Sequence, residues 1–443
     1  MRWRLALGTI RAHRASHLAS AAVMAAGTAL LTAFASLLET GLATGRDPGF
    51  LVMLPAILGG WTVAIVAFGV VSTVSLTIGH RERELALLRS IAATPRQIRQ
   101  DVVLETVAVA VPAILAGLLP GAGLGAVVLG RLVDGGLVEG GTGLVAGWAS
   151  AAIGAGTSLA AALAAALISS RRAASVPPVR ALGAAPGGTV GGALGRGRVI
   201  GGGALLAVGL SLSVTTLFMD DGPLLSSTAG PAGVAVAVGL ALLSPLFVAP
   251  VGWLSRARLG AAGRLAARNL HARARHAGGV AGPLILLVGI AAGTLYMQST
   301  EDSLHRTAAD VSGRLAPVNY LVVAMIITFT AIVVVNTLIA ATRRRGREFG
   351  LLRLSAATRG QVMATVVAEG TVTAVVAVVL GTVAAAATTV PYSLVKTGSP
   401  LPSGPWWTYA AVAGGALLLV LAASIPTAAG ALRVRPVDAL SAP

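Results

Sequence analysis

Long apolar runs alternate with short polar segments along the whole chain. A membrane-spanning helix needs roughly 20 mostly apolar residues, and ten stretches meet that requirement. They lie at about 17–38, 51–79, 100–129, 145–169, 199–219, 231–254, 278–297, 317–341, 362–390 and 406–430. The pattern therefore predicts an all-α, polytopic membrane protein with about ten transmembrane helices.

Composition agrees with this prediction. Of 443 residues, 55% are hydrophobic and only 11% are charged, and the mean hydropathy is +0.84. A water-soluble domain carries about twice that charged fraction. The 56 glycines and the 4% of aromatic residues suit membrane helices that pack closely through small side chains. There is no cysteine, which excludes disulfides and thiolate metal sites.

The net charge of +17 would be typical of a nucleic-acid-binding protein if the chain were soluble. Its distribution argues otherwise. If the ten spans alternate in direction, 28 of the 33 basic residues fall on the side that holds both chain ends, in segments 1–16, 80–99, 170–198, 255–277, 342–361 and 431–443. Basic residues in short loops mark the cytoplasmic side. We therefore expect a multi-pass protein of the cell (inner or plasma) membrane with both termini cytoplasmic, membrane lipid as a partner and no nucleic acid.

Two polar segments repeat each other. The segment HRERELALLRSIAATPRQIRQ (80–100) shares its skeleton with TRRRGREFGLLRLSAATRGQV (342–362), 264 positions later. A basic lead-in and a closing Val-x-Pro-Val-x-Ala-Leu segment also recur, at offsets of 260 and 258. Each copy then holds four spans, and two further spans join them. This 4+2+4 arrangement predicts two parallel repeats, at 1–183 and 259–443, with linking helices at 184–258.

Each polar segment contains a helix-start signal. Thr94 and Gln97, like Thr358 and Gln361, have the spacing of a capping box, in which the Thr hydroxyl and the Gln side chain satisfy each other's backbone amides. Pro95 suits the first helical position of the first copy. The spacing predicts helices that start at about 95 and 359, preceded by helices that run to about 91 and 355. Each pair would meet at a capped Ala-Ala-Thr corner in the cytosol.

Apolar residues recur on one face of the helix before each corner. Leu85, Leu88 and Ala92 share a face at spacings of three and seven. They could pack on their own bundle. The alternative is that the two copies form two docking surfaces for a pair of similar partners, in which charge gives orientation and leucine gives burial.

The stretch RERELALLRSIAATPRQI, followed by a long apolar span, resembles the FtsX-like (MacB-type) permease domain of ABC transporters. The resemblance covers both four-span repeats. It implies that each polar segment contacts a cytoplasmic ABC ATPase subunit, two copies in all, which bind the ATP-Mg. The implied contact residues are Arg83, Glu84, Leu87, Leu88, Arg89, Ala93 and Thr94 in the first copy and Arg347, Glu348, Leu351, Leu352, Arg353, Ala357 and Thr358 in the second.

The resemblance implies ATP-driven export or extraction of a substrate, and short outer segments favour a hydrophobic or amphipathic one. Relatives often carry a large extracytoplasmic domain, whereas segments 39–50 and 298–316 are too short for a fold of about 40 residues. An alternative is a subunit without cargo that transmits force to an extracytoplasmic partner. A channel or secondary transporter is a third possibility.

Catalytic chemistry is not indicated in this chain. The sole lysine, Lys396, lies outside any P-loop. No membrane span contains a His-x-x-x-His pair; His13 and His17 have that spacing but lack the glutamate of a zinc-protease motif and lie in the basic lead-in. We therefore expect a non-catalytic subunit without metal or cofactor of its own. Gly121 and Gly125 have the spacing of small residues at a helix contact. Asp101, Glu105 and Glu369 lie near the cytoplasmic ends of spans three and nine, where Glu105 and Glu369 are candidates either for structural pairing with arginine or for a proton or substrate role.

Overall fold

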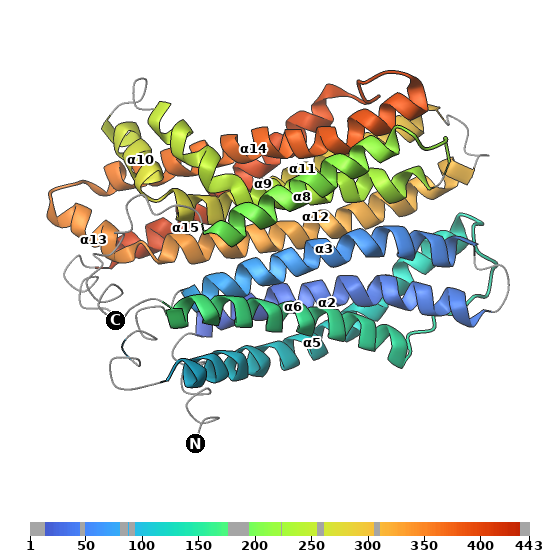
Figure 1. Ribbon diagram of the computed structural model, residues 1–443, viewed down its shortest axis with the longest axis horizontal. Helices are drawn as coiled ribbons and strands as arrows, with labels where there is room; N and C mark the ends of the chain where they lie inside the picture. The colour runs from blue at the N-terminus through green and yellow to red at the C-terminus, as the bar shows by residue number, and fades with distance from the viewer. Residues whose placement is uncertain are drawn as a thin grey trace. The chain divides into compact units, whose positions relative to one another are not determined.

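The computed structural model describes residues 14–44, 49–79, 87, 94–175, 195–222, 224–254, 261–304 and 311–434 (Figure 1). Over these residues the regular structure is entirely helical, which confirms the all-α prediction. The helices are α2 (Arg14–Ala43), α3 (Gly49–Gly79), α5 (Pro95–Asp134), α6 (Trp148–Ser175), α8 (Arg196–Thr216), α9 (Leu225–Leu254), α10 (Ala261–Ala272), α11 (Ala274–Leu304), α12 (Val311–Arg343), α13 (Gly346–Leu354), α14 (Arg359–Thr397) and α15 (Trp406–Arg433).

Ten helices in the described part are long and apolar enough to cross a membrane, as predicted. Each of the ten overlaps one predicted span, and most extend beyond it. Helices α5 and α14 have 40 and 39 residues. At 1.5 Å per residue each is about 60 Å long, roughly twice the hydrocarbon thickness of a bilayer. Both helices must therefore project into water. Inside lipid, the helical form satisfies every backbone amide and carbonyl.

The chain divides into two compact units. The first contains residues 1–184 with segments 221–230 and 295–330, and the second contains 185–220, 231–294 and 331–443. Helices α9, α11 and α12 are therefore each shared between the units. The predicted division into repeats of four helices with two linking helices remains a prediction.

In the first unit, α2 contacts α3, α5 and α6, so the first four long helices form one bundle around it. Glycines of α5 allow close approach to α2. A Cβ atom at Gly121 would lie 2.7 Å from the backbone oxygen of Ala29, and one at Gly125 would overlap Ser36. This confirms the small-residue contact predicted for 121–125.

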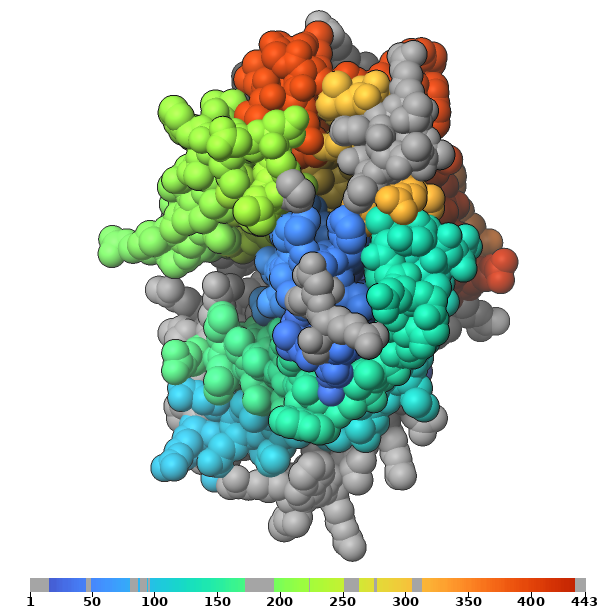
Figure 2. Space-filling view, turned by 90° about the vertical axis from the view of Figure 1, so that its right-hand side faces the viewer, coloured from blue at the N-terminus to red at the C-terminus, as the bar shows by residue number. Residues whose placement is uncertain are grey.

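The far end of this bundle is closed by the connection between α5 and α6. The carboxylate of Glu39, near the end of α2, accepts hydrogen bonds from the backbone amides of Gly147 and Ser150 at 3.0 and 2.9 Å. These bonds cap the start of α6, where the first amides of a helix otherwise lack partners. Figure 2 shows this connection (teal) against the end of α2 (blue).

In the second unit, α14 has the central position and contacts α8, α10, α13 and α15. Hydroxyl groups join these helices. The Ser213 hydroxyl of α8 donates to the Ala387 carbonyl of α14 at 2.9 Å. The hydroxyls of Thr382 in α14 and Tyr409 in α15 lie 2.7 Å apart. Helices α8 and α9 meet through facing glycines, because a Cβ at Gly239 would lie 2.9 Å from the backbone oxygen of Gly202. The corner between α13 and α14 lies at one end of this unit (Figure 1).

Candidate functional site

The second corner is formed by the short helix α13 between two long helices, α12 and α14. Helix α12 ends at Arg343, residues 344 and 345 form a turn, and α13 begins at Gly346. The predicted end of the helical segment, at about 355, is confirmed, because α13 ends at Leu354. The prediction of one uninterrupted helix up to that point is wrong, since a turn separates α12 from α13. Gly346, the first residue after the turn, has low helix propensity. Arg345 lies in this turn and contacts the acidic partners described below.

The turn after α13 has a Schellman geometry. The amide of Ala357 donates to the Leu352 carbonyl at 3.0 Å, and the amide of Ala356 donates to the Arg353 carbonyl at 3.2 Å. Ala356 has a φ of 68°, in the left-handed region that usually requires glycine. An alanine there stores about 1 kcal/mol of backbone strain. Position 356 thus makes the sharp corner at a cost in stability.

Both predicted capping boxes are confirmed. The Gln97 amide donates to the Thr94 hydroxyl at 3.3 Å, and the Thr94 amide donates to the Gln97 side-chain oxygen at 2.8 Å. Thr358 and Gln361 make the same pair of bonds at 3.2 and 2.9 Å. Pro95 opens α5 as expected. The two copies therefore start their long helices in the same way.

The apolar side of α13 is divided between the protein core and the solvent. Phe349 is 1% exposed and forms a buried cluster with Val362, Val366, Ala428 and Leu432, against which Leu352 and Ala357 pack. Phe349 and Leu352, the counterparts of Leu85 and Leu88, therefore point inward in the second copy, whereas Ala356, the counterpart of Ala92, is exposed. The outward apolar side chains are Leu351 and Leu354, which are 49% and 53% exposed.

The first copy can be compared at two of its predicted contact residues. Thr94 is exposed, and Leu87 is 52% exposed, close to the value for its counterpart Leu351. The other predicted contact residues of this copy lie outside the described residues; they are Arg83, Glu84, Leu88, Arg89 and Ala93.

Arg345 is the centre of a charge network beneath the second corner. Its Nε donates to Glu348 at 3.0 Å, and its Nη2 donates to Glu369 of α14 at 3.1 Å. The Arg345 guanidinium also lies 5.3 Å from the centre of the Phe349 ring, a cation–π distance. Two residues from the region of α10 complete the network. Asn269 donates to Glu369 at 2.7 Å, and Arg273 pairs with Glu348.

The structure shows the first of the two possibilities that the sequence left open for Glu369, because this carboxylate is paired with Arg345. Arg345 joins α13 to α14, and Arg273 and Asn269 join both to the segment around α10. The sequence indicated an arginine partner but not which one. The arginine-rich run 343–347 was the signal in the sequence for such a partner. No sequence signal identified Asn269 and Arg273 as members of the network.

The remaining predicted residues of the second corner have different surroundings. Arg353 donates to the carbonyls of Leu432 and Val434 at 3.0 Å each and so ties α13 to the end of α15. Arg347 and Thr358 are exposed. The accessible surface at this corner is thus a pair of leucines flanked by arginine, on a base that is fixed to its own unit.

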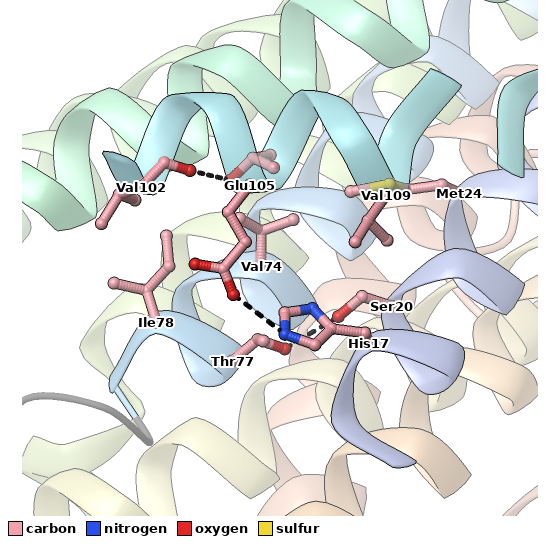
Figure 3. Close-up of a pocket in the computed structure, with 10 residues that line it drawn as sticks. His17, Ser20, Met24, Val74, Thr77, Ile78, Val102, Glu105 and Val109 are labelled. Carbon is pink, nitrogen blue, oxygen red and sulfur yellow. Dashed lines mark hydrogen bonds and ion pairs between the residues drawn. The ribbon is translucent and has the colours of Figure 1, made fainter. Parts of the chain in front are cut away.

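Glu105, the repeat counterpart of Glu369, contacts a histidine of α2. Its carboxylate lies 3.0 Å from Nε2 of His17, and both side chains are less than one-tenth exposed. They line a pocket between α2, α3 and α5 (Figure 3). Nothing in the sequence predicted this contact, because His17 stands in the basic lead-in and was noted there only for its spacing from His13. Asp101, one turn earlier on α5, is exposed.

The model of one known family, described as FtsX-like permease C-terminal, matches this chain twice, over residues 56–178 and 320–436. The two matched regions cover more than half of the chain, and each contains one of the capped corners. No curated protein matches the chain.

Proposed function

This chain belongs to the FtsX-like permease family, and from that premise we propose that it is the transmembrane permease subunit of an ABC transporter complex in the plasma membrane. Two separate cytoplasmic ATPase subunits would bind and hydrolyse the ATP-Mg, and each would press on one of the capped corners. This chain supplies the pathway or the moving part, not the catalytic chemistry.

The observation that carries the proposal is the equivalence of the two corners. Both long helices start from the same capping box. Leu87 and Leu351 occupy equivalent positions ahead of these caps and are exposed to almost the same degree. A half-exposed leucine among arginines combines apolar burial with electrostatic orientation, the combination that protein interfaces use. Two such sites suit two copies of one partner.

The contacts of the second corner can also transmit a displacement of α13 to the helices behind it. Its outer leucines are free to meet a partner, while Phe349 on the opposite side is anchored in the cluster with α14 and α15. Arg353 adds a bond from α13 to the end of α15. A displacement of α13 therefore moves the start of α14 and the end of α15 with it. Because α14 continues for 39 residues, the movement reaches the far side of the membrane.

The decisive experiment is co-purification with a cytoplasmic ABC ATPase subunit from the same cells. We expect the double variant Leu87→Asp/Leu351→Asp to lose more than tenfold in ATPase association, because two buried leucines contribute about 3–6 kcal/mol together. Each single variant keeps one intact corner and should lose less. The matched control is Leu401→Asp, which changes a leucine that is 76% exposed in the connection between α14 and α15. Full association of the double variant would reject the corners as docking sites.

A second test addresses the side of the membrane. The chain contains no cysteine, so a cysteine placed at the exposed Ser355 gives a signal without background. An impermeant maleimide should label it in inside-out vesicles and not in intact cells. Labelling in intact cells would reject the proposed orientation.

A further inference from the structure

Helix α10 carries an exposed basic face (Figure 1). Arg264, Arg268 and His271 recur at spacings of four and three, which places them on one side of the helix, and all three are exposed. The opposite side is buried against α14 and consists of Ala266, Ala267 and Leu270. Segment 255–277, which contains α10, has no acidic residue. The segment itself therefore supplies no negative charge to this face.

The basic face is part of a fixed structure. Asn269, on the adjoining side of α10, donates to the Glu369 carboxylate of α14 at 2.7 Å. Nδ1 of His271 lies 3.3 Å from the backbone oxygen of Ala249, near the end of α9. These contacts hold α10 against two long helices. The positions of the basic residues are thus set before a ligand binds, which lowers the entropic cost of binding.

Helix α10 lies at the level where the hydrocarbon region ends. The apolar span of α9 ends at Pro250, and that of α11 begins at Ala277. The two ends lie close together, because the Ser244 hydroxyl of α9 donates to the Gly278 carbonyl of α11 at 2.9 Å. His271 contacts α9 one residue before the end of its span. The basic face therefore meets the headgroup region of a bilayer.

An apolar surface adjoins the basic face. Leu246 and Phe247 of α9 precede Ala249 by less than one helical turn and are 51% and 38% exposed. Both belong to the apolar span of α9, so they face hydrocarbon in a bilayer. Cationic side chains of α10 and apolar side chains of α9 thus meet near His271. This order matches an amphipathic molecule with an anionic headgroup.

A phospholipid suits this surface better than a protein. Among the residues of α10 whose side chains are described, the exposed ones are Arg264, Arg268, His271 and Ala272, and none of them is a large apolar residue. Protein interfaces bury an apolar core inside a polar rim, and the two corners offer half-exposed leucines for that purpose. Basic residues attract anionic headgroups without such an apolar anchor.

We propose that α10 binds the headgroup phosphate of an anionic phospholipid. Arg264 and Arg268 are about 6 Å apart, one helical turn, so two guanidinium groups can donate to one phosphate, whose oxygens match the guanidinium fork. The acyl chains extend along Leu246 and Phe247. The site requires only that the chain is inserted in a bilayer. It does not depend on an ATPase and so stands apart from the proposed function.

The test measures which lipid occupies the surface beside α10. The chain has no cysteine, so Ala272→Cys, at an exposed position next to His271, takes a bimane label in the purified full chain. The labelled chain is placed in nanodiscs that mix phosphatidylglycerol with phosphatidylcholine, one of which carries brominated acyl chains that quench the label. Exchanging the brominated lipid gives the relative occupancy of the two lipids. We expect phosphatidylglycerol to be preferred about 25-fold, because each arginine near an anionic surface contributes about fivefold.

Two pairs of substitutions localise the preference. Arg264→Gln/Arg268→Gln should abolish most of it, whereas Arg264→Lys/Arg268→Lys keeps the charge and should retain most of it. The matched control is Arg343→Gln/Arg433→Gln, which removes the same charge from two exposed arginines at the ends of α12 and α15. This control should leave the lipid preference unchanged.

The quenching series on the unaltered chain decides the question even if a variant does not fold. Equal quenching by the two lipids would overturn the proposal; together with a loss of ATPase association in Arg264→Gln/Arg268→Gln, it would assign the basic face to a protein partner. Displacement of the lipid by inorganic phosphate at constant ionic strength would indicate a site for free anions and also overturn the proposal.

The variants give a further decision. An unchanged preference in Arg264→Gln/Arg268→Gln would place the lipid elsewhere, and an equal loss in the control pair would show only diffuse attraction by a chain of net charge +17. Either result would reject a specific site on α10. The corners are tested by ATPase association and this site by lipid occupancy without an ATPase, so the two proposals fail separately.

Discussion

The ion pair between Arg345 and Glu369 gives the most specific prediction about how the second corner is held. Arg345 contacts Glu348 and Glu369 through three of its nitrogens. We consider Arg345→Met, which removes the guanidinium but keeps much of the side-chain length, and Glu369→Gln, which removes one charge at constant shape. The double variant completes a cycle that isolates the interaction between the two residues.

The magnitudes follow from burial. In Arg345→Met, the Glu369 carboxylate, which is 11% exposed, retains only the Asn269 amide among the partners described above. Removing one member of a buried pair costs about 3–5 kcal/mol, because the other charge stays buried. Arg345 is 21% exposed, so some water reaches the site and the lower value of about 3 kcal/mol is expected.

Glu369→Gln is milder, since Arg345 still has Glu348, and we expect a loss of about 1.5 kcal/mol. In the double variant neither charge of this pair is left alone. Its stability should therefore be close to that of Arg345→Met, about 3 kcal/mol below the unaltered chain, instead of the additive loss of about 4.5 kcal/mol. The coupling energy is then about 1.5 kcal/mol.

The measurement is the free energy of unfolding of each purified variant in mixed micelles, titrated with denaturing detergent. Arg347→Met is the matched control, because Arg347 is exposed on the same helix, and its effect should stay within about 0.5 kcal/mol. Strictly additive losses would show that the two side chains do not interact in solution. An Arg345→Met loss no larger than that of the control would show that the network does not stabilise the corner.

Two further predictions concern backbone geometry. Gly121→Ala should destabilise the first unit by about 1–3 kcal/mol, because its Cβ would meet the backbone of Ala29 at 2.7 Å; the control Gly123→Ala, with no atom within 4 Å of its Cβ, should be neutral or gain up to about 1 kcal/mol, and equal effects would contradict the close helix contact. Ala356→Gly should raise stability by about 1 kcal/mol in the same unfolding assay, because glycine adopts the left-handed φ without strain, and a loss of stability would contradict the strained corner.

The features that could be predicted from sequence are those set by local patterns. A span shows itself through roughly 20 apolar residues in a row, and all ten were predicted. A capping box depends on two residues three positions apart, so the starts of α5 and α14 were predicted to the residue. Span ends were predicted less well, because a helix that leaves the membrane continues without any apolar signal.

The inward face of α13 could not be predicted, and the reason is physical. The nine-residue helix carries Phe349, Leu351, Leu352 and Leu354, so apolar side chains point in several directions. Periodicity identifies a buried face only when the remaining faces are polar. The choice is made by the partners from α14 and α15 that surround Phe349, which are distant in sequence. The same limit applies to the network around Arg345, whose members come from α13, α14 and the region of α10.

The two repeats share a carboxylate at one position. Glu369 lies in a network that joins α10, α13 and α14 around one corner. Glu105, its counterpart, lies beside His17 between α2, α3 and α5. A carboxylate buried near the membrane interface needs charged or hydrogen-bonding partners in either place. In the second repeat these partners come from three neighbouring segments, so the carboxylate acts there as a structural joint that fixes the corner to the long helix behind it.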